Sequence, residues 1–272
     1  MLACMSLPAP STDSRAVVTG ASSGIGTALA EELAARGYSL IVVARRGAVL
    51  EELAARLRQE HGVQVEVREV DLSDHAARDT LAAELAERSI SVLCNNAGVA
   101  TFGPVAELDH GFERELVQLN AVAVHDLTLA VLPGMLERRG GGILITGSAA
   151  GNLPVPNNAT YAATKAFVNS FAESLRGELA GTGVHVTLLA PGPVRTETPD
   201  PAEATIVDKI LPDSLWVTSE SVAKESLDGL ARNKMRVVPG IVSKVMSVGG
   251  GYSPRAVSAP IIGKLYRKFG EG

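Results

Sequence analysis

Apolar and polar residues follow two different periods along this chain. Short apolar runs at residues 14–19, 38–44 and 63–70 are each bounded by glycine or polar residues, which is typical of buried strands. Residues 27–36 repeat their apolar side chains at the spacing of one helix face, and Gly37 follows as a helix stop. Because strand patterns alternate with helical ones, the sequence predicts an α/β fold with a doubly wound parallel sheet and helices on both faces.

A glycine-rich turn joins the first predicted strand to the first predicted helix, and it reads Gly20-Ala-Ser-Ser-Gly24-Ile-Gly26. Gly20 and Gly24 permit a tight turn and a close backbone approach to a pyrophosphate, and Gly26 lets the helix pack against the strand. The amides at the start of the helix attract an anion. The context favours a dinucleotide site over an ordinary strand-to-helix turn. The predicted contacts of this turn are Gly20, Ser22, Ser23, Gly24, Ile25 and Gly26.

The end of the second predicted strand indicates which dinucleotide is bound. An NAD site usually carries an Asp or Glu there, which binds the ribose 2′-hydroxyl. This chain has Ala44 at that place, followed by Arg45 and Arg46. Since guanidinium groups clamp phosphates, the sequence predicts NADP(H), with Arg45 on the 2′-phosphate. Arg46 is either a second contact or a solvated charge at the start of the next helix.

Tyr161 and Lys165 stand four residues apart, and Ser148 precedes Tyr161 by thirteen. Residues i and i+4 share one face of a helix, so the ammonium of Lys165 can lie beside the phenol of Tyr161. A free tyrosine has a pKa of about 10, and a nearby cation is expected to lower it. Such a tyrosine can exchange a proton with an oxygen atom of a substrate. Taken alone, this spacing also occurs by chance on helix surfaces.

In order and in spacing, these motifs resemble the short-chain dehydrogenase/reductase family over residues 14–240. That resemblance implies a single Rossmann-type catalytic domain. The matching residues are Thr19-Gly20-xxx-Gly24-Ile25-Gly26, Asp71, Asn95-Asn96-Ala97-Gly98, Asn120, Ser148, Tyr161, Lys165 and Pro191-Gly192-Pro193-Val194-Arg195-Thr196.

The resemblance implies a role for each cofactor-binding residue outside the glycine turn. Asp71 and its neighbour Leu72 are expected at the adenine. Asn95, Ala97 and Gly98 are expected to line the adenosine ribose and to brace the central sheet. The segment expected at the nicotinamide comprises Pro191, Gly192, Val194 and Thr196, of which Val194 acts through its backbone.

The resemblance also implies the catalytic roles. Ser148 and Tyr161 are expected to bind and polarise a ketone oxygen, and Tyr161 to donate the proton. Lys165 is expected to tune Tyr161 and to hold the nicotinamide ribose. Asn120 is expected to hold a water molecule that links Lys165 to solvent. The family usually has two serines where this chain has Gly147-Ser148, but the interval to Tyr161 is retained.

Composition sets the organisation of the chain. With 272 residues and 46% hydrophobic content, it can bury one sizeable core. We expect a flexible lead-in at residues 1–13, the catalytic domain at 14–240 and a basic C-terminal extension at 241–272. The apolar stretch at 121–136 is interrupted by charged and proline residues, and no secretory signal precedes it, so a cytoplasmic protein is expected.

Cysteine and histidine usage agrees with that expectation. The two cysteines, Cys4 and Cys94, lie in the lead-in and at the end of an apolar strand, which makes a disulfide unexpected. The five histidines show no metal-ligand spacing, so no metal is expected.

Charge is distributed unevenly along the chain. Residues 231–272 hold eight Lys and Arg residues against one Glu, although the whole chain carries a net charge of −5. The basic tail either meets anionic lipid at the inner face of a membrane or packs on the acidic body or a partner subunit. Nucleic-acid binding is not expected from an acidic chain without a recognition module.

The predicted substrate cleft is apolar. Its walls are expected from residues 149–158, Phe102 and residues 195–216, which suit a hydrophobic carbonyl compound. Residues 119–135 and 233–240 resemble an actinobacterial reductase of this family, which acts on the 3-oxo group formed during mycolic acid synthesis. That likeness implies a very long β-keto acyl ester as substrate.

Three other functions remain open at this point. A reductase of steroids or small hydrophobic ketones would use the same catalytic residues. A reductase of 3-oxoacyl carrier proteins would need a basic patch at the cleft mouth. A non-catalytic NADP-binding sensor would need no catalytic set. Relatives pair through the helices that carry Asn120 and Tyr161, so a homodimer or homotetramer is expected.

Overall fold

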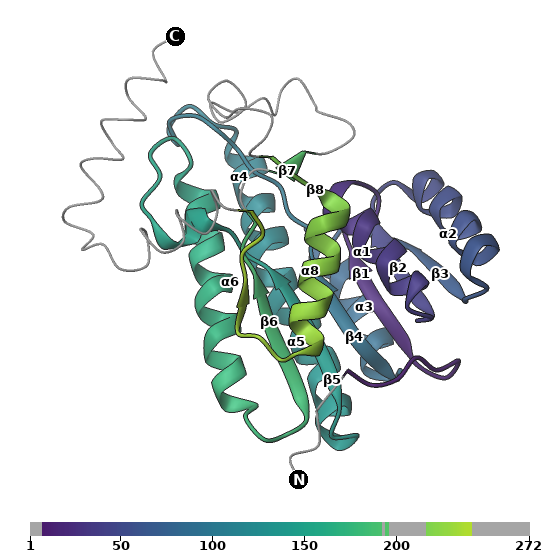
Figure 1. Cartoon of the computed structure of the whole chain (residues 1–272). Coiled ribbons are helices and arrows are strands. Elements are labelled where there is room, and N and C mark those ends of the chain that lie inside the picture. Colours follow the sequence, from purple (N-terminus) through teal and green to yellow (C-terminus); the bar gives the residue numbers. More distant parts are fainter. Residues whose placement is uncertain (1–6, 192–193, 196–215, 241–272) are drawn as a thin grey trace.

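A seven-stranded parallel sheet forms the centre of the protein (Figure 1). The computed structural model describes residues 7–191, 194–195 and 216–240. In spatial order the strands are β3 (Val65–Glu69), β2 (Leu40–Ala44), β1 (Arg15–Thr19), β4 (Ile90–Asn95), β5 (Gly141–Thr146), β6 (Val184–Leu189) and β9 (Arg236–Val237). Every neighbouring pair in this sheet is parallel. The strand order reverses between β1 and β4, and in such sheets a ligand binds beyond the carboxyl ends of the strands at that point.

Helices cover both faces of the sheet. One face packs against α1 (Gly24–Ala35), α2 (Gly47–His61) and α8 (Ser219–Ala231). The other packs against α3 (His75–Ala86), α5 (Ala123–Glu137) and α6 (Ala159–Glu178). Each layer has its own buried core, which confirms the predicted doubly wound fold. The remaining described elements are α4 (His110–Val117), a π-helix (Gln118–Val122), a 3₁₀ helix (Ala149–Asn152), and a small sheet of β7 (Val194–Arg195) and β8 (Val217–Thr218).

The boundaries differ from the predicted ones at the site of interest. The first helix begins at Gly24, three residues before the predicted start at position 27. The reason is that Ser23 is extended and serves as the N-cap, so the second half of the glycine turn is already helical. The amides of Gly24, Ile25 and Gly26, which are predicted to face a pyrophosphate, are therefore part of the helix itself.

One helical stretch, His110–Glu137, would be long and apolar enough for a membrane span if only length and composition were considered. Of its most apolar window, 44% is buried within the protein. The α5 part of this stretch packs on the sheet through Leu127, Val131 and Met135. A core helix passes the same test of length and composition.

Candidate functional site

The turn after β1 has the backbone geometry of an anion cradle. Gly20 and Gly24 have φ values of +68° and +53°, a region that glycine adopts without strain. A Cβ atom at Gly26 would lie 2.0 Å from the carbonyl oxygen of Gly20, so no other residue fits there. The N-cap residue Ser23 makes no side-chain hydrogen bond to the first turn of α1. The first amides of α1 therefore lack a side-chain cap, and a phosphate group suits them.

The two arginines after β2 point to different partners. Arg46 reaches back to the glycine turn, where its Nη2 donates to the carbonyl oxygen of Ser22 at 2.8 Å and to Ser22 Oγ at 3.0 Å. Arg45 is 61% exposed, and its Nη1 lies 4.0 Å from Asp71 Oδ2. Arg46 is thus held against the glycine turn, whereas Arg45 leans towards the predicted adenine side.

Thr19 ties the turn after β4 to the end of β1. Its Oγ1 accepts hydrogen bonds from the amides of Asn96 (2.9 Å) and Ala97 (3.0 Å). A Cβ atom on Gly20 would lie 2.9 Å from Ala97 Cα, so the two turns are in close contact. Gly20 and Ala97, both predicted to contact the cofactor, therefore lie together in the turns that follow the neighbouring strands β1 and β4.

Asn95 behaves differently from its neighbours. Its side chain is 2% exposed and donates to Thr128 Oγ1 at 3.0 Å and to the carbonyl oxygen of Val124 at 3.3 Å. The side chain braces α5 instead of lining a ribose site.

Ser148, Tyr161 and Lys165 come together beyond the carboxyl end of β5. Ser148 follows that strand, and the first turns of α6 carry the other two. Ser148 lies close enough to Tyr161 to act on the pKa of its phenol, and Ser148 Oγ accepts from the amide of Ala150 at 3.1 Å. Lys165 Nζ lies 5.7 Å from the centre of the Tyr161 ring and donates to the carbonyl oxygen of Thr146 at 2.8 Å. The sequence spacing thus brings a hydroxyl, a phenol and an ammonium into one site.

The pKa of Tyr161 corrects one expectation. Burial raises this pKa above 10.0, and Ser148 opposes the shift only in part. Burial also lowers the pKa of Lys165 to about 8. The net direction is opposite to the predicted lowering of the Tyr161 pKa, because desolvation by burial is the largest cause of the shift. Tyr161 accordingly holds its proton at neutral pH.

Asn120 lies on the π-helix and is fully buried. Its Oδ1 accepts from the amide of Val99 at 3.0 Å, and its Nδ2 donates to the carbonyl oxygen of Val99 at 2.8 Å. Its Nδ2 also lies 3.3 Å from Thr164 Oγ1. A Cβ atom on Gly98 would lie 3.1 Å from Asn120 Oδ1 and 3.5 Å from Lys165 Nζ. The side chain braces the loop after β4, and its link to a water molecule stays a prediction.

The remaining residues that were predicted to bind the cofactor lie partly inside and partly outside the described part of the chain. Leu72 is buried after β3, and Asp71 Oδ1 accepts from the amide and hydroxyl of Ser73. Pro191 is partly buried after β6, and Val194 packs against the core from β7. Gly192, Thr196 and the basic extension at 241–272 lie outside the residues that the structure describes.

Two loops form the described wall of the substrate side. The amide of Gly103 donates to the carbonyl oxygen of Asn157 at 2.8 Å, and Asn158 Nδ2 donates to the carbonyl oxygen of Thr101. Phe102 on this wall is 50% exposed. That the other predicted wall residues lie beside the catalytic set stays a prediction, and residues 196–215 lie outside the part of the chain that the structure describes.

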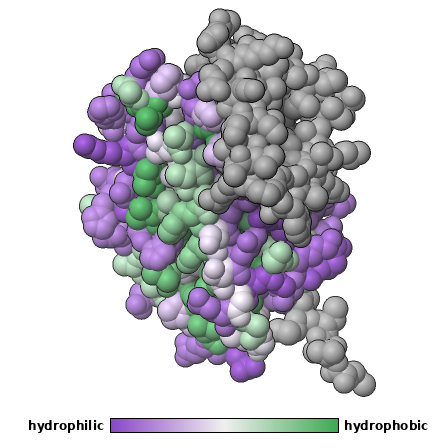
Figure 2. Space-filling view, turned by 90° about the vertical axis from the view of Figure 1, so that its left-hand side faces the viewer, coloured by the Kyte–Doolittle hydropathy of each residue, from purple (hydrophilic) through white to green (hydrophobic). Residues whose placement is uncertain are grey.

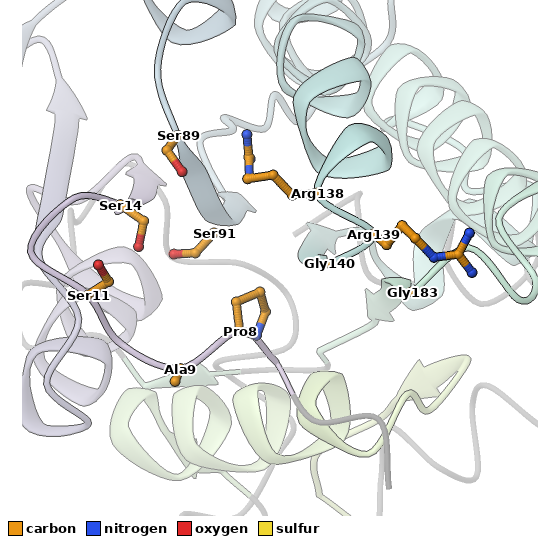
Figure 3. A pocket seen from close by; sticks show the side chains of 10 residues that line it. All are labelled: Pro8, Ala9, Ser11, Ser14, Ser89, Ser91, Arg138, Arg139, Gly140 and Gly183. Atoms are coloured by element: carbon orange, nitrogen blue, oxygen red, sulfur yellow. The ribbon is translucent and has the colours of Figure 1, made fainter. Parts of the chain in front are cut away.

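A cavity of about 470 Å³ lies elsewhere (Figure 3). Its lining includes Ser14, Ser89, Gly140 and Gly183, which precede β1, β4, β5 and β6. Because the strands are parallel, this cavity lies at the sheet edge opposite the catalytic residues. The Arg139 side chain points away from the serine hydroxyls in Figure 3.

A reactive thiol and a metal site would each add chemistry to the protein. The Cys94 thiol is buried, and burial raises its pKa to about 12, so it is unreactive. Among the described residues, no cluster of three or more His, Cys, Asp or Glu side chains could hold a metal ion.

The sequence motifs included Thr19 without giving it a role, and they missed Thr146 and the buried Arg78. All three act through contacts with residues far along the chain. Of the two that were missed, only Arg78 carried a usable signal, because it shares a helix face with Leu81 and Leu85.

Comparisons with known proteins agree with this geometry. The family model for short chain dehydrogenase matches residues 14–206. A very-long-chain 3-oxoacyl-CoA reductase from Bos taurus is 38% identical over 187 residues, which cover 67% of this chain and 60% of the bovine protein. Sulfoacetaldehyde reductase 2 from Chromohalobacter salexigens is 40% identical over 185 residues, covering 66% of this chain and 73% of that protein.

Solved structures show the same likeness. A short-chain dehydrogenase from Sphingobium yanoikuyae in complex with NADPH has a TM-score of 0.78 and 33% identity, covering 87% of this chain and 92% of that one. The bulky-bulky ketone specific alcohol dehydrogenase from Comamonas testosteroni has a TM-score of 0.75 and 29% identity, covering 90% of this chain and 97% of that one. With the fold, the glycine turn and the family match together, this chain belongs to the short-chain dehydrogenase family.

Proposed function

We propose that this protein is an NADPH-dependent ketoreductase whose substrate is the 3-oxo group of a long-chain acyl lipid. The observation that carries the proposal is the Ser148–Tyr161–Lys165 arrangement beside the uncapped glycine turn. Its proton-donating phenol and its anion cradle lie at the same edge of the sheet. A non-catalytic sensor would have no need of the phenol.

The protein binds the cofactor through backbone and guanidinium groups. The first amides of α1 would hold the pyrophosphate. Arg45, which is exposed beside Asp71, would bind the 2′-phosphate, and Arg46, which bonds Ser22, would be a second contact. The absence of a carboxylate at Ala44 removes the group that would repel that phosphate.

The chain's own residues then handle the carbonyl oxygen. When bound, NADPH supplies a hydride. Ser148 and Tyr161 would donate hydrogen bonds to the ketone oxygen and orient it. Tyr161, which is protonated at neutral pH, would pass its proton to that oxygen as negative charge develops there. Lys165 would keep a positive charge beside the phenol and bind a ribose hydroxyl.

The chain-length part of the proposal has narrower support. The bovine relative is named for very-long-chain 3-oxoacyl-CoA, although this chain spans only 60% of its length. The exposed side chain of Phe102 adds an apolar surface beside the site. A β-keto ester of the mycolic acid type is the specific substrate proposed, with the basic extension working at the inner face of the membrane.

A second candidate is a reductase of bulky ketones or steroids. The Comamonas testosteroni structure, named for bulky-bulky ketones, favours it at 29% identity. Its catalytic residues would be the same, so only substrates distinguish the two candidates.

The test is NADPH oxidation across 3-oxoacyl esters of increasing chain length, with NADH and a bulky aromatic ketone as controls. A rate that rises with chain length supports the lipid reductase. A high rate on the bulky ketone, with none on any ester, supports the second candidate. No rate on either, with NADPH still bound, would contradict both.

We also propose that the protein forms a homodimer through α5 and α6. Large apolar side chains stay exposed there, with Leu129 at 49% and Phe167 at 46%. Phe167 stacks on Phe171 with ring centres 6.0 Å apart. Figure 2, which views the molecule from the side where α6 lies in Figure 1, shows apolar residues running down this face. Leu129→Glu should convert the dimer to a monomer in light scattering, and an unchanged mass would contradict the assignment.

A further inference from the structure

Arg78 is a buried guanidinium in a position where an apolar residue would fit. It lies on α3 beside Leu81 and Leu85 and is 1% exposed. Burying an arginine is unfavourable unless every donor finds a partner, and apolar replacements of buried ion pairs are often neutral or stabilising. Packing therefore gives no reason for an arginine at this position.

All three nitrogens of the guanidinium have partners, and these come from three other segments. Nε donates to Asp126 Oδ2 on α5 at 2.8 Å. Nη1 donates to the carbonyl oxygen of Leu72 at 2.9 Å, in the loop after β3. Nη2 donates to Gln118 Oε1 at 3.0 Å and lies 3.4 Å from His75 Nδ1. The planar fork holds these partners at fixed spacing.

Two of these partners belong to the functional site. Leu72 follows Asp71, so Arg78 fixes the peptide that is predicted to face the adenine. Gln118 is the first residue of the π-helix that carries Asn120, which in turn braces Val99 near the catalytic set. A π-helix is rare and frequently marks a functional site.

We propose that Arg78 is a positioning residue that holds the adenine-side loop and the π-helix of Asn120 in one fixed arrangement. Binding at the adenine end is thereby linked to the geometry at the catalytic end. The catalytic half of this inference rests on the proposed function, whereas the adenine half does not.

The test compares Arg78→Lys with Arg88→Lys. Arg88 follows α3 and bonds both Glu66 and Glu84, so its substitution removes a similar number of contacts away from the site. Arg78→Lys should raise the Kd of both NADPH and adenosine 2′,5′-bisphosphate about tenfold, which is the loss of one charged hydrogen bond. Arg88→Lys should leave both Kd values within about twofold. The Kd values are read by fluorescence without any ketone present.

The catalytic half is tested by turnover. The kcat of Arg78→Lys combined with Asn120→Ala should equal that of Asn120→Ala alone, because both changes act on one turn. If Arg78→Lys does not fold, Gln118→Ala leaves Arg78 in place and should lower kcat with an unchanged NADPH Kd.

Two results would overturn the inference. One is a Kd for adenosine 2′,5′-bisphosphate that is the same in Arg78→Lys and the unaltered protein, which would leave Arg78 only a structural role. The other is a double variant whose kcat loss is the product of the single losses. A protein without activity on any ketone would contradict the proposed function and leave the adenine-side result standing.

Discussion

This protein contains two networks of polar and charged side chains, one at the predicted active site and one on the surface of the sheet, and they differ in their effect on stability. The network of Tyr161, Lys165 and Asn120 is buried between the sheet and α6, and its ammonium contacts no carboxylate in the part of the chain that the structure describes. The network around Glu66 lies on the surface of β3, where three arginines share two carboxylates. Burial lowers the pKa of Lys165, whereas arginine partners lower the pKa of Glu66 to about 2. Burial of the first network lowers the stability of the fold but positions the reactive groups. The ion pairs of the second network raise the stability of the fold and take no part in the chemistry.

The largest effect is expected at the phenol. Tyr161→Phe should lower kcat by roughly 10²–10⁴-fold, because the proton donor is removed, and should leave NADPH binding unchanged. Stopped-flow turnover and cofactor fluorescence measure the two quantities. Tyr38→Phe is the matched control, since the Tyr38 hydroxyl donates to the carbonyl oxygen of Pro8 far from the site. Loss of NADPH binding in Tyr161→Phe would assign this residue to the cofactor instead.

The buried ammonium should show the trade between activity and stability. Lys165→Met should abolish most turnover yet stabilise the fold at pH 7 by up to about 3 kcal/mol, which corresponds to the shift of the pKa from 10.5 to about 8. Because the folded pKa lies below the unfolded value, the unaltered protein should gain stability as pH rises from about 8 towards 10.5. Denaturant unfolding at pH 7 and pH 10 measures both. If Lys165→Met were less stable than the unaltered protein at pH 7, the conclusion that the buried ammonium lowers the stability of the fold would be contradicted.

Reduction should also depend on pH through the same group. The rate should be level below pH 8 and fall as pH rises through about 8, where Lys165 loses its charge. Ester reduction at saturating NADPH gives the profile. A rate that stays level to pH 10 would show that the charge on Lys165 is not needed.

A smaller effect is expected at the two arginines after β2. Arg46→Ala should weaken NADPH binding about tenfold and leave NADH nearly unchanged, since its guanidinium lies over the glycine turn at Ser22. Arg45→Asp should also weaken NADPH far more than NADH. Titrations with both cofactors compare the variants. Equal losses for NADH and NADPH would remove the assignment of NADP(H).

The smallest effect on function is expected at Glu66, which is the counterpart to Lys165. Its folded pKa of about 2 lies below the ordinary 4.5, so its contribution is present above pH 4.5 and is lost as pH falls towards 2. Glu66→Gln should therefore lower the free energy of unfolding by about 2 kcal/mol at pH 7. The variant and the unaltered protein should converge near pH 2, with kcat unchanged. If the folded Glu66→Gln variant lost activity, the network around Glu66 would also affect catalysis, and the contrast with the buried network would fail.

Much of the fold followed from local patterns, because strand and helix periods and glycine turns are encoded within a few residues. The glycine turn and the Tyr161–Lys165 spacing were accessible for the same reason. The inward turn of Asn95 and the direction of the Tyr161 pKa were not, since both depend on packing against α5 and on burial. Arg46 against Ser22 depends on how β1 and β2 lie side by side.

The charges on β3 have a further consequence for the protein in a crowded solution. This strand forms one margin of the sheet, at the right of Figure 1, and such a margin offers unpaired backbone groups to other chains. Glu66, Arg68 and Glu69 place a charge at three of its five positions. A second strand docking there would have to strip water from these groups, so the same residues that add stability also discourage edge-to-edge aggregation.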